Sequence, residues 1–548
     1  MERQQQSQLD ASRDDRQTFW YTITAVVAAL IGLALALGLS PRRARAQEAV
    51  ESGAFLIRTA KDTVVIERFR RTATALTSTL TVQGQPRIEY TAVLGPRNTV
   101  PSLTIDVYAA SATADDKPLQ HVVATVKGDS VTVDAPTGSH TIASKAGAIP
   151  SMNNAMALFE VLTRRARQNG DTSVPYFAMS GQTVPVILTK VGADSLIVAI
   201  AGQVQRYKVD AVGRIAGGSI SGTYTLERLS TAAAATLKIG KPDYSPPKDA
   251  PYTAEEVTLK GQHGITLGGT LTLPKNANGP VPAIVTITGS GQQDRDEFIP
   301  VAGGYRPFRQ VADTLGRRGI AVLRLDDRTV GASGGAIGTS ADYAEDVKAA
   351  LAYLRTRKEI DAKRLGLVGH SEGGLIAPLV ASTEPGLAGI VTFAGPAYNG
   401  LDIIHFQQRN AFEHDTAMRK LNLDSLSKAA AASIDSAAAK DVWLKFFLTY
   451  DPLATAKKVK VPTLILQGQT DQQVTYEQAE KLGAALKAGG NKDVTVRVFP
   501  EMNHLFIHDT DGNPNGYAKL PTNKMSAEAL GVMADWLVKH LGGARVTP

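Results

Sequence analysis

The chain has 548 residues, of which 43% are hydrophobic and 20% are charged, so it can form more than one domain with a core of its own. Its net charge of +7 is small for this length, and no lysine- and arginine-rich block is interleaved with aromatic residues, so the composition argues against a nucleic-acid partner. The absence of cysteine excludes disulfides, thiolate metal sites, a cysteine nucleophile and a lipidated cysteine anchor.

Residues 1–46 are typical of a signal peptide or a membrane anchor. No charge falls between Arg16 and Arg42, and residues 25–39 are apolar apart from two glycines. Ala44-Arg-Ala46 then fits the small-x-small pattern that precedes a cleavage site, so we expect export to the periplasm or the medium. The segment before the apolar run is not basic overall, and the basic cluster of Arg42, Arg43 and Arg45 follows the run. A retained membrane tether through residues 20–39 is therefore the alternative.

Residues 47–235 predict a separate β-rich domain of antiparallel strands. Short runs rich in valine, isoleucine and threonine are divided by turn residues, and one helix is expected over residues 153–167. Strands are expected at 53–59, 63–69, 88–93, 103–109, 122–126 and 196–201. The next segment, 236–251, contains four prolines and reads as a linker, because proline cannot supply ladder or helix hydrogen bonds.

From residue 252 the pattern changes to strands that alternate with helices. The strands are short and almost continuously apolar, which predicts a doubly wound, mostly parallel sheet covered by helices on both faces. Two amphipathic strands, 255–259 and 265–273, should form an antiparallel edge. The later strands are expected at 283–288, 320–325, 365–368, 389–393, 463–467 and 494–499, and the helices at 308–318, 342–355, 374–382, 476–488 and 526–540.

Ser371 is the candidate nucleophile. Gly369-His-Ser-Glu-Gly-Gly374 follows an apolar strand and precedes a helical run, which is the setting of a nucleophile elbow. Gly369 and Gly373 fit because strand and helix pack closely there. The bare pattern arises often by chance, but a strand–turn–helix setting makes it specific.

A serine nucleophile needs a base, and the base needs an orienting carboxylate. In the α/β-hydrolase fold these follow the serine in the order acid, then histidine. Asp471 comes just after the strand 463–467, and His504 comes shortly after the strand 494–499. His508 competes with His504, but it lies in a turn-rich stretch that reads as exposed.

Two backbone N–H groups should stabilise the oxyanion. One is expected from Glu372, the residue after the nucleophile. The other is expected from the glycine-containing loop after the strand 283–288, at Ser290, with Gly291 or Gln292 as the alternative. Glycine lets the backbone approach a substrate closely.

Several of these motifs together resemble the esterase D-like family of bacterial α/β-hydrolases. The resemblance covers residues 252–548 and implies hydrolysis of carboxylic esters, usually with short acyl chains, without a metal or organic cofactor. It also implies that Ser371, Asp471 and His504 form the catalytic triad. The matching motifs are Gly289-Ser-Gly-x-x-Asp-Arg-Asp-Glu297, Asp326-Asp-Arg-Thr-Val-Gly-Ala-Ser333, Gly369-His-Ser-Glu-Gly-Gly374, Tyr450-Asp-Pro452 and Asn503-His-Leu-Phe506.

The same resemblance assigns supporting roles to charged residues near the nucleophile. Asp294, Arg295 and Asp296 would shape the oxyanion loop. Asp327 and Arg328 would buttress the neighbouring loop without reacting.

An insertion over residues 398–450 should form a helical lid. It follows the sixth strand, where this fold usually carries a lid, and residues 425–439 are alanine-rich. Its last part carries Trp443, Phe446, Phe447 and Tyr450. These side chains could form a wall of the acyl pocket, or they could pack the lid onto the core.

Two other functions remain open. An exported peptidase or amidase would use the same triad, and turnover of amides against esters would separate the two. A non-catalytic protein that binds carbohydrate or protein would use the fold only as a scaffold. All three triad positions are filled, which argues against the binding protein. The expected partner is a small-molecule ester substrate.

Overall fold

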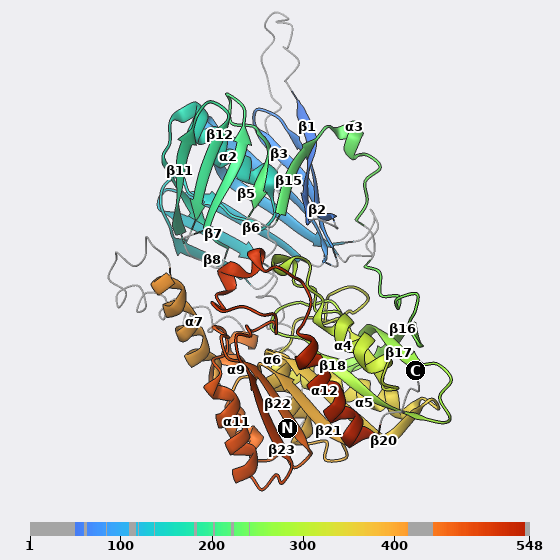
Figure 1. Ribbon diagram of the computed structural model, residues 1–548. Coiled ribbons are helices and arrows are strands. Elements are labelled where there is room, and N and C mark those ends of the chain that lie inside the picture. The colour runs from blue at the N-terminus through green and yellow to red at the C-terminus, as the bar shows by residue number, and fades with distance from the viewer. Residues whose placement is uncertain are drawn as a thin grey trace, which may run out of the picture. The chain divides into compact units, whose positions relative to one another are not determined.

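The structure, a computed structural model, describes residues 50–542 apart from 60–62, 84, 109–116, 119, 136–137, 180–182, 201–202, 221–223, 240–241 and 415–441. The chain divides into two compact units, Met1–Lys241 and Pro242–Pro548, each with its own sheet (Figure 1). The predicted signal or anchor, 1–46, and the tether, 20–39, lie outside the described residues. None of the helices in the described part is long and apolar enough to cross a membrane.

The first unit is built on one 15-stranded sheet, in the order β8-β7-β6-β5-β4-β3-β2-β1-β15-β14-β13-β12-β11-β10-β9. Neighbours pair antiparallel, except β9 and β10, which are parallel. The predicted β-rich domain is therefore present. Its strands are β1 (Glu51–Arg58), β2 (Thr63–Arg71), β3 (Ala75–Val82), β4 (Arg87–Gly95), β5 (Thr99–Tyr108), β6 (Gln120–Lys127), β7 (Ser130–Ala135), β8 (Gly138–Ala143), β9 (Ile149–Pro150), β10 (Ser173–Phe177), β11 (Thr183–Val191), β12 (Ser195–Ile200), β13 (Gln203–Val209), β14 (Ile215–Ile220) and β15 (Tyr224–Leu229).

The helix α2 (Met156–Arg164) is buried along its whole length, and it continues as a short π-helix over Arg165–Asn169. Two buried carboxylates attach it to the strands. Glu67 of β2 accepts a hydrogen bond from Ala157 N at 2.9 Å, and Glu160 of α2 accepts one from Ile215 N at 2.9 Å. Burial raises the pKa of Glu67 to about 7, against the hydrogen bonds that favour its charged form. A second, short helix, α3 (Thr231–Ala234), follows β15.

The second unit contains an eight-stranded sheet in the order β16-β17-β19-β18-β20-β21-β22-β23. β16 and β17 are antiparallel, as is the β17–β19 pair, and every later pair is parallel. This is the predicted mostly parallel sheet with an antiparallel edge. The strands are β16 (Tyr252–Lys260), β17 (Thr266–Pro274), β18 (Val281–Ile287), β19 (Ala321–Leu325), β20 (Ile360–His370), β21 (Gly389–Phe393), β22 (Thr463–Gly468) and β23 (Val494–Phe499).

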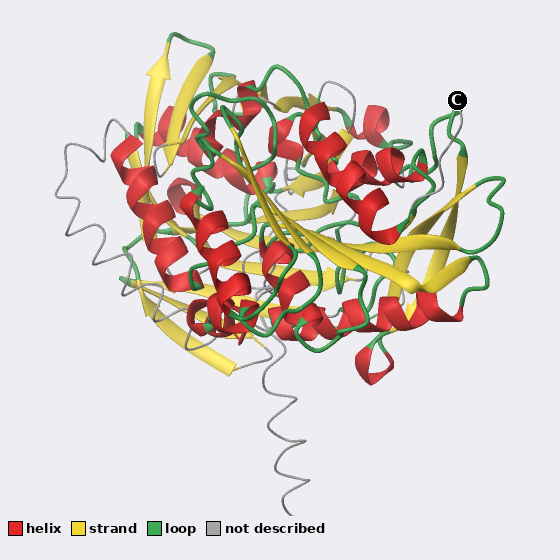
Figure 2. Cartoon of the chain, turned by 60° about the horizontal axis from the view of Figure 1, so that its bottom comes forward, coloured by secondary structure: helices red, strands yellow, loops and turns green. Residues whose placement is uncertain are grey.

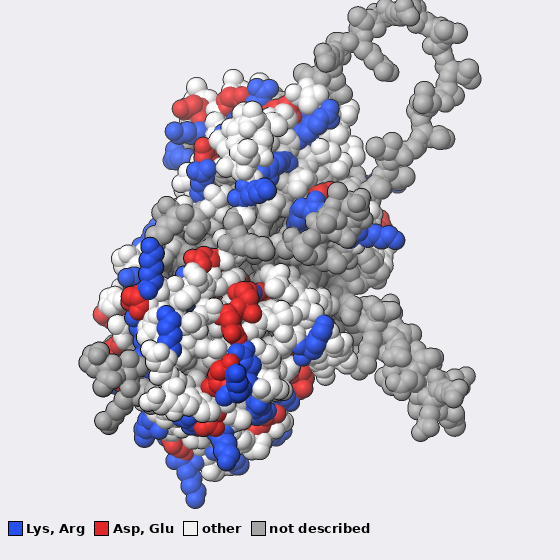
Figure 3. All heavy atoms as spheres, turned by 90° about the vertical axis from the view of Figure 1, so that its right-hand side faces the viewer, with Lys and Arg blue, Asp and Glu red and all other residues white. Residues whose placement is uncertain are grey.

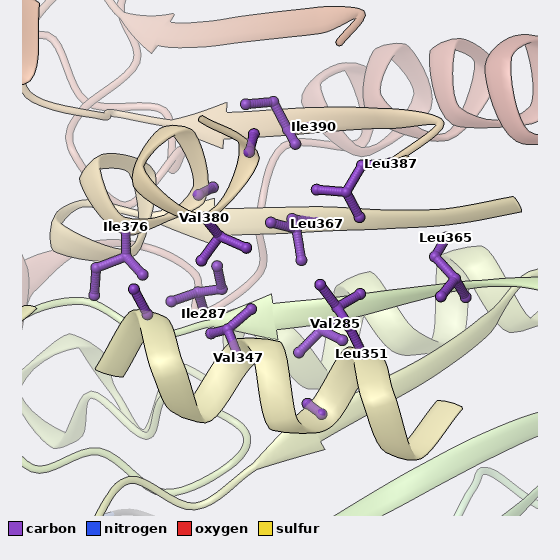
Figure 4. Packing of buried hydrophobic residues seen from close by; sticks show 14 of the residues in the cluster. Val285, Ile287, Val347, Leu351, Leu365, Leu367, Ile376, Val380, Leu387 and Ile390 are labelled. Atoms are coloured by element: carbon purple, nitrogen blue, oxygen red, sulfur yellow. The ribbon is translucent and has the colours of Figure 1, made fainter. Parts of the chain in front are cut away.

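Helices cover both faces of this sheet (Figure 2). α4 (Pro307–Gly316) and α12 (Ala527–Leu541) pack on one face. α5 (Ser340–Thr356), α6 (Glu372–Ala381) and α11 (Glu477–Ala488) pack on the other. Figure 4 shows how α5 packs on this second face, with Val347 and Leu351 pointing toward Val285 and Leu367 of the central strands. Because the central strands β18, β21 and β22 are buried on both faces, their sequences are mostly apolar without alternation.

The insertion after β21 is described only in part. α7 (Gly400–His414) and α9 (Val442–Thr449) are helical, and α10 (Pro452–Ala456) follows them. The alanine-rich part of the predicted lid, 425–439, lies outside the described residues.

Charged side chains of both signs are mixed on the surface. On the face shown in Figure 3, basic and acidic residues alternate over each unit, with no extended block of one sign. This distribution fits the small net charge of +7.

Candidate active site

Ser371 lies in a sharp turn between β20 and α6, at the C-terminal end of the parallel strands. Its backbone has φ 53° and ψ −117°, a conformation that a non-glycine residue adopts only at a cost. Ser371 N donates to Phe393 O at 2.8 Å, which fixes the turn to the end of β21. The serine side chain is therefore held at the C-terminal ends of the parallel strands, where ligands bind in open α/β folds.

The two glycines of the elbow are required by close packing. A Cβ on Gly369 would lie 2.0 Å from Gly373 O, and a Cβ on Gly373 would lie 2.0 Å from Ile287 O. Both obstacles are backbone atoms, so a side chain could not be accommodated by a rotamer change.

Replacement of Gly373 with alanine is therefore expected to destabilise the hydrolase unit and to misplace the nucleophile. The added methyl group must push α6 away from β18, which should lower the free energy of unfolding by about 1–3 kcal/mol. Thermal unfolding of the variant, followed by circular dichroism, measures the loss.

Gly531 provides the matched control, because it lies inside α12 and a Cβ there would meet no atom within 4 Å. Alanine at this position should leave the protein as stable or stabilise it by up to about 1 kcal/mol, as expected for an exposed helix interior. Equal melting temperatures for the Gly373 variant and the unmodified protein would contradict the packing argument.

His504 and Asp471 form a buried acid–base pair. His504 Nδ1 lies 2.8 Å from Asp471 Oδ2, and each residue is only 4% exposed. This contact leaves Nε2 as the ring nitrogen that can accept a proton. Between the described residues no hydrogen bond joins Ser371 Oγ to His504, and such contacts commonly tighten only when substrate binds.

Asp471 is fixed from three sides as a charged acceptor. Its Oδ1 accepts hydrogen bonds from Gln473 N at 2.7 Å and Val474 N at 2.9 Å, and Gln467 Nε2 donates to Oδ2 at 2.9 Å. A carboxylate that accepts several hydrogen bonds is held in position. Gln467 is the next-to-last residue of β22 and was not among the predicted site residues. A polar residue near the end of a mostly apolar strand is the signal that could have identified it.

Three backbone N–H groups near Ser371 have no acceptor among the described residues, namely those of Ser290, Gly291 and Glu372. Their neighbours are occupied: Gly289 N donates to Glu297 Oε1 at 3.0 Å, and Gln293 N donates to Asp327 Oδ2 at 2.9 Å. A Cβ on Gly289 would lie 3.2 Å from the Ser371 Cβ, so this loop passes directly beside the nucleophile. The predicted oxyanion donors therefore lie on the two segments that meet at the serine.

The other predicted alternative, Gln292, has a defined side-chain contact. Its Nε2 donates to Thr329 Oγ1 at 2.7 Å, so the side chain is directed toward the neighbouring loop.

Buried charges hold the loop after β18 in shape. Asp327 accepts a hydrogen bond from Thr288 Oγ1 at 2.8 Å in addition to the one from Gln293 N, and burial raises its pKa well above the usual range. Arg295 donates to Asp326 from Nη2 at 2.7 Å and from Nε at 3.0 Å. These contacts stabilise the loop at both ends and do not reach the nucleophile.

Asp294, Asp296 and Arg328 also make structural contacts that hold this region in shape. Asp294 accepts hydrogen bonds from Asp296 N at 3.1 Å and Phe298 N at 2.9 Å, and Asp296 is paired with Arg324. Arg328 is paired with Asp346 of α5 at 2.6 Å.

The side chain of Glu372 joins the elbow to the insertion. Its Oε1 accepts hydrogen bonds from Ser340 Oγ at 2.6 Å and from Trp443 Nε1 of α9 at 2.7 Å. Burial raises the pKa of this carboxyl. The indole of Trp443 stacks on Phe447, with centroids 5.0 Å apart, and Phe447 belongs to the core. Phe447 thus packs the insertion onto the core, whereas Trp443 lies next to the elbow.

His508 is not part of the buried acid–base pair. Its side chain is 68% exposed and contacts Glu501 at 3.1 Å on the surface, while His504 is buried against Asp471.

Comparison with known proteins places this unit among hydrolases. Residues 338–543 match the prolyl oligopeptidase family, and residues 263–399 match the X-Pro dipeptidyl-peptidase (S15) family. Esterase EstD of Thermotoga maritima is 27% identical over 342 residues, which cover 59% of this chain and 77% of the relative. An uncharacterized peptidase of Bacillus subtilis, YuxL, is 25% identical over 306 residues, covering 52% of this chain and 39% of the relative. A solved esterase from Pyrococcus furiosus is 20% identical, covers 56% of this chain and 96% of its own, and has a TM-score of 0.39.

The sequence matches and the architecture agree. The family matches fall in the unit that carries the parallel sheet, and this unit has the strand–turn–helix elbow of that fold at Ser371. The chain is therefore a serine esterase-like protein of the α/β-hydrolase superfamily.

Proposed function

We propose that this protein is a serine hydrolase that cleaves carboxylic esters with short acyl chains, using Ser371 as nucleophile, His504 as base and Asp471 as the orienting acid. The observation that carries the proposal is the meeting of three features. A strained serine projects from the elbow, a buried His–Asp pair comes from two later loops, and uncommitted N–H groups lie beside the serine. Acyl transfer needs all three.

The proposed reaction has two acyl-transfer steps. His504 Nε2 takes the proton of Ser371 as Oγ attacks the ester carbonyl, and the N–H groups of Glu372 and Ser290 or Gly291 stabilise the oxyanion. His504 then gives the proton to the leaving alcohol. In the second step His504 activates a water molecule that releases the acid and restores the serine. Asp471 keeps the proton of the imidazole on Nδ1 and stabilises the imidazolium.

A short acyl group is supported by the resemblance to esterase D-like proteins. A cavity of about 40 Å³ lies beside the oxyanion loop, and Gly289, Gly291, Glu372 and Ile376 are among the residues that line it.

A peptidase or amidase is the second candidate. Both matched families are named as peptidases, and the triad chemistry is the same. The two functions differ in the leaving group that the enzyme must expel, so they are separated by substrate and not by catalytic residues.

The test is a pair of substrate series under one set of conditions: p-nitrophenyl esters from acetyl to long acyl, and p-nitroanilides of amino acids and of X-Pro dipeptides. We expect ester turnover to be highest at short acyl length and kcat/KM for the esters to exceed that for every anilide. Higher kcat/KM for a dipeptide anilide would assign the peptidase function. No turnover in either series would favour a binding role.

We further propose that the protein is exported. Support comes from the apolar run over residues 25–39 and the pattern Ala44-Arg-Ala46. Mass spectrometry of the N-terminus of the natively expressed protein distinguishes cleavage before Gln47 from a tether retained through residues 20–39.

A further inference from the structure

A second buried histidine–carboxylate pair lies directly behind the proposed triad. His370 precedes the nucleophile, and its Nδ1 lies 2.7 Å from Glu297 Oε1. The other ring nitrogen, Nε2, lies 3.0 Å from the main-chain oxygen of His504. His370 is 4% exposed and Glu297 is 1% exposed, so water does not compete for these contacts.

The pair joins three loops. Glu297 Oε1 also accepts the hydrogen bond from Gly289 N at 3.0 Å, which fixes the start of the oxyanion loop. His370 belongs to the nucleophile elbow, and its contact with His504 fixes the loop of the base. One carboxylate oxygen and one imidazole therefore connect the oxyanion loop, the nucleophile elbow and the loop of the base.

The partners of His370 determine its protonation state. A carbonyl oxygen can only accept, so Nε2 must carry a hydrogen. Nδ1 faces a carboxylate oxygen that already accepts the Gly289 N–H, and it most simply donates as well. Burial alone would lower the pKa of His370, but the Glu297 carboxylate outweighs it and raises that pKa. Both nitrogens then carry hydrogen, and the ring is an imidazolium.

We propose that His370 is a positioning residue, which together with Glu297 aligns the oxyanion loop, the nucleophile and the base, and whose positive charge disfavours a second positive charge on the ring of His504. The inference rests on the proposed serine-hydrolase function. The opposition is electrostatic: the rings of His370 and His504 have centroids 4.9 Å apart, and two cations at that separation in a buried site repel strongly.

Other titratable groups near the two histidines are part of the same balance. Asp471 favours the charged form of His370, and Tyr517 lies close to Asp471 and His504. Tyr305 and Asp327 face Glu297. None of these side chains makes a hydrogen bond to His370, whereas Glu297 does. The charge of Glu297 is therefore the one that the experiment removes.

The test measures how fast an alkyl fluorophosphonate labels Ser371 as a function of pH. In this reaction Oγ attacks phosphorus, fluoride leaves, and His504 takes the serine proton, so the acid limb of the rate reports protonation of the base. The probe needs no natural substrate. A failure of the ester proposal, with labelling intact, is therefore distinguishable from a failure of this one.

In Glu297→Gln the amide oxygen can take the place of Oε1 and accept hydrogen bonds from Gly289 N and His370 Nδ1, so these two contacts are kept while the charge is lost. We expect the acid limb to move to higher pH by about half a unit or more, because His370 no longer holds a proton when His504 gains one. His370→Asn should shift the limb in the same direction. Glu297→Ala breaks the contacts as well and should slow labelling at every pH, by up to about a hundredfold.

Glu501→Gln is the matched control, since it removes a carboxylate from a histidine pair on the surface, with side chains 59% and 68% exposed. Its acid limb should coincide with that of the unmodified protein. Acid limbs that stay in place in both Glu297→Gln and His370→Asn would overturn the proposal, whatever the loss in rate, as would a protein that the probe does not label.

A second readout does not depend on activity. Nitrogen-15 NMR of histidine-labelled protein should show one ring, absent from His370→Asn, with both nitrogens protonated at pH 8. In Glu297→Gln that ring should become neutral. A neutral His370 ring at pH 8 in the unmodified protein would refute the assignment.

Discussion

Replacement of Ser371 with alanine is expected to lower kcat for the best p-nitrophenyl ester by about 10⁴–10⁶-fold, the range found when a triad nucleophile is removed. The oxyanion donors and the binding site remain, so a small residual rate above that in water should persist. KM should change little, because the hydroxyl contributes to the transition state and not to ground-state binding. Steady-state kinetics of the purified variant, with a thermal melt to verify folding, make the measurement.

Ser382→Ala provides the control from the same helix. Ser382 caps the C-terminal end of α6, and its hydroxyl donates only to Leu379 O at 2.7 Å. Its loss should leave kcat within about twofold and cost about 1 kcal/mol of stability at most. If Ser371→Ala retained most of the activity while folding normally, the nucleophile would have to be sought elsewhere.

Asp471→Asn is expected to lower kcat by about 10⁴-fold without unfolding the loop. The amide oxygen of asparagine can still accept from Gln473 N and Val474 N, so the loop keeps its shape. The amide nitrogen then faces His504 Nδ1 and donates to it, which places the ring proton on Nε2. In that tautomer His504 cannot accept the proton of Ser371.

The same change at Asp451 is the control. Asp451 caps α10 by accepting from Ala454 N at 3.0 Å, and asparagine is an equally good cap. Asp451→Asn should therefore leave both kcat and the melting temperature unchanged. A loss below about tenfold in Asp471→Asn would show that this carboxylate does not orient the base.

The fold of the second unit could be predicted in detail because its sequence signals are local. Strands such as β18 and β22 are short apolar runs, and their ends are set by proline or polar residues. The helix α5 begins with a capping box between Thr339 and Asp342, and its apolar spacing matches the face that it buries. In the β-rich unit several strands and the helix could be predicted, but the order of the strands could not, because strand order depends on pairings far apart in sequence.

The residues of the candidate site also differ in whether a local sequence signal identifies them. Ser371, Asp471 and His504 could be identified because each follows a strand at a fixed place in this fold. Glu297 and His370 could not, since nothing in the sequence indicates that residues 73 positions apart form a hydrogen bond. Trp443 was assigned to the lid, but its bond to Glu372 arises only when α9 packs beside the elbow. Contacts between loops depend on tertiary packing, which local sequence patterns do not indicate.

The pairing of the first and last strands of the β-rich unit affects how that unit can fold. β1 contains Ala54, and its partner in β15 is Leu229, so this ladder closes a loop of almost the whole unit. Hairpins such as β4–β5 can form within microseconds, but closure of so long a loop carries a large entropic cost before any contact is gained. The β1 strand must therefore wait with one edge unpaired until translation has produced β15. During that time it is open to pairing with another chain, so rapid synthesis or early chaperone contact would protect this protein.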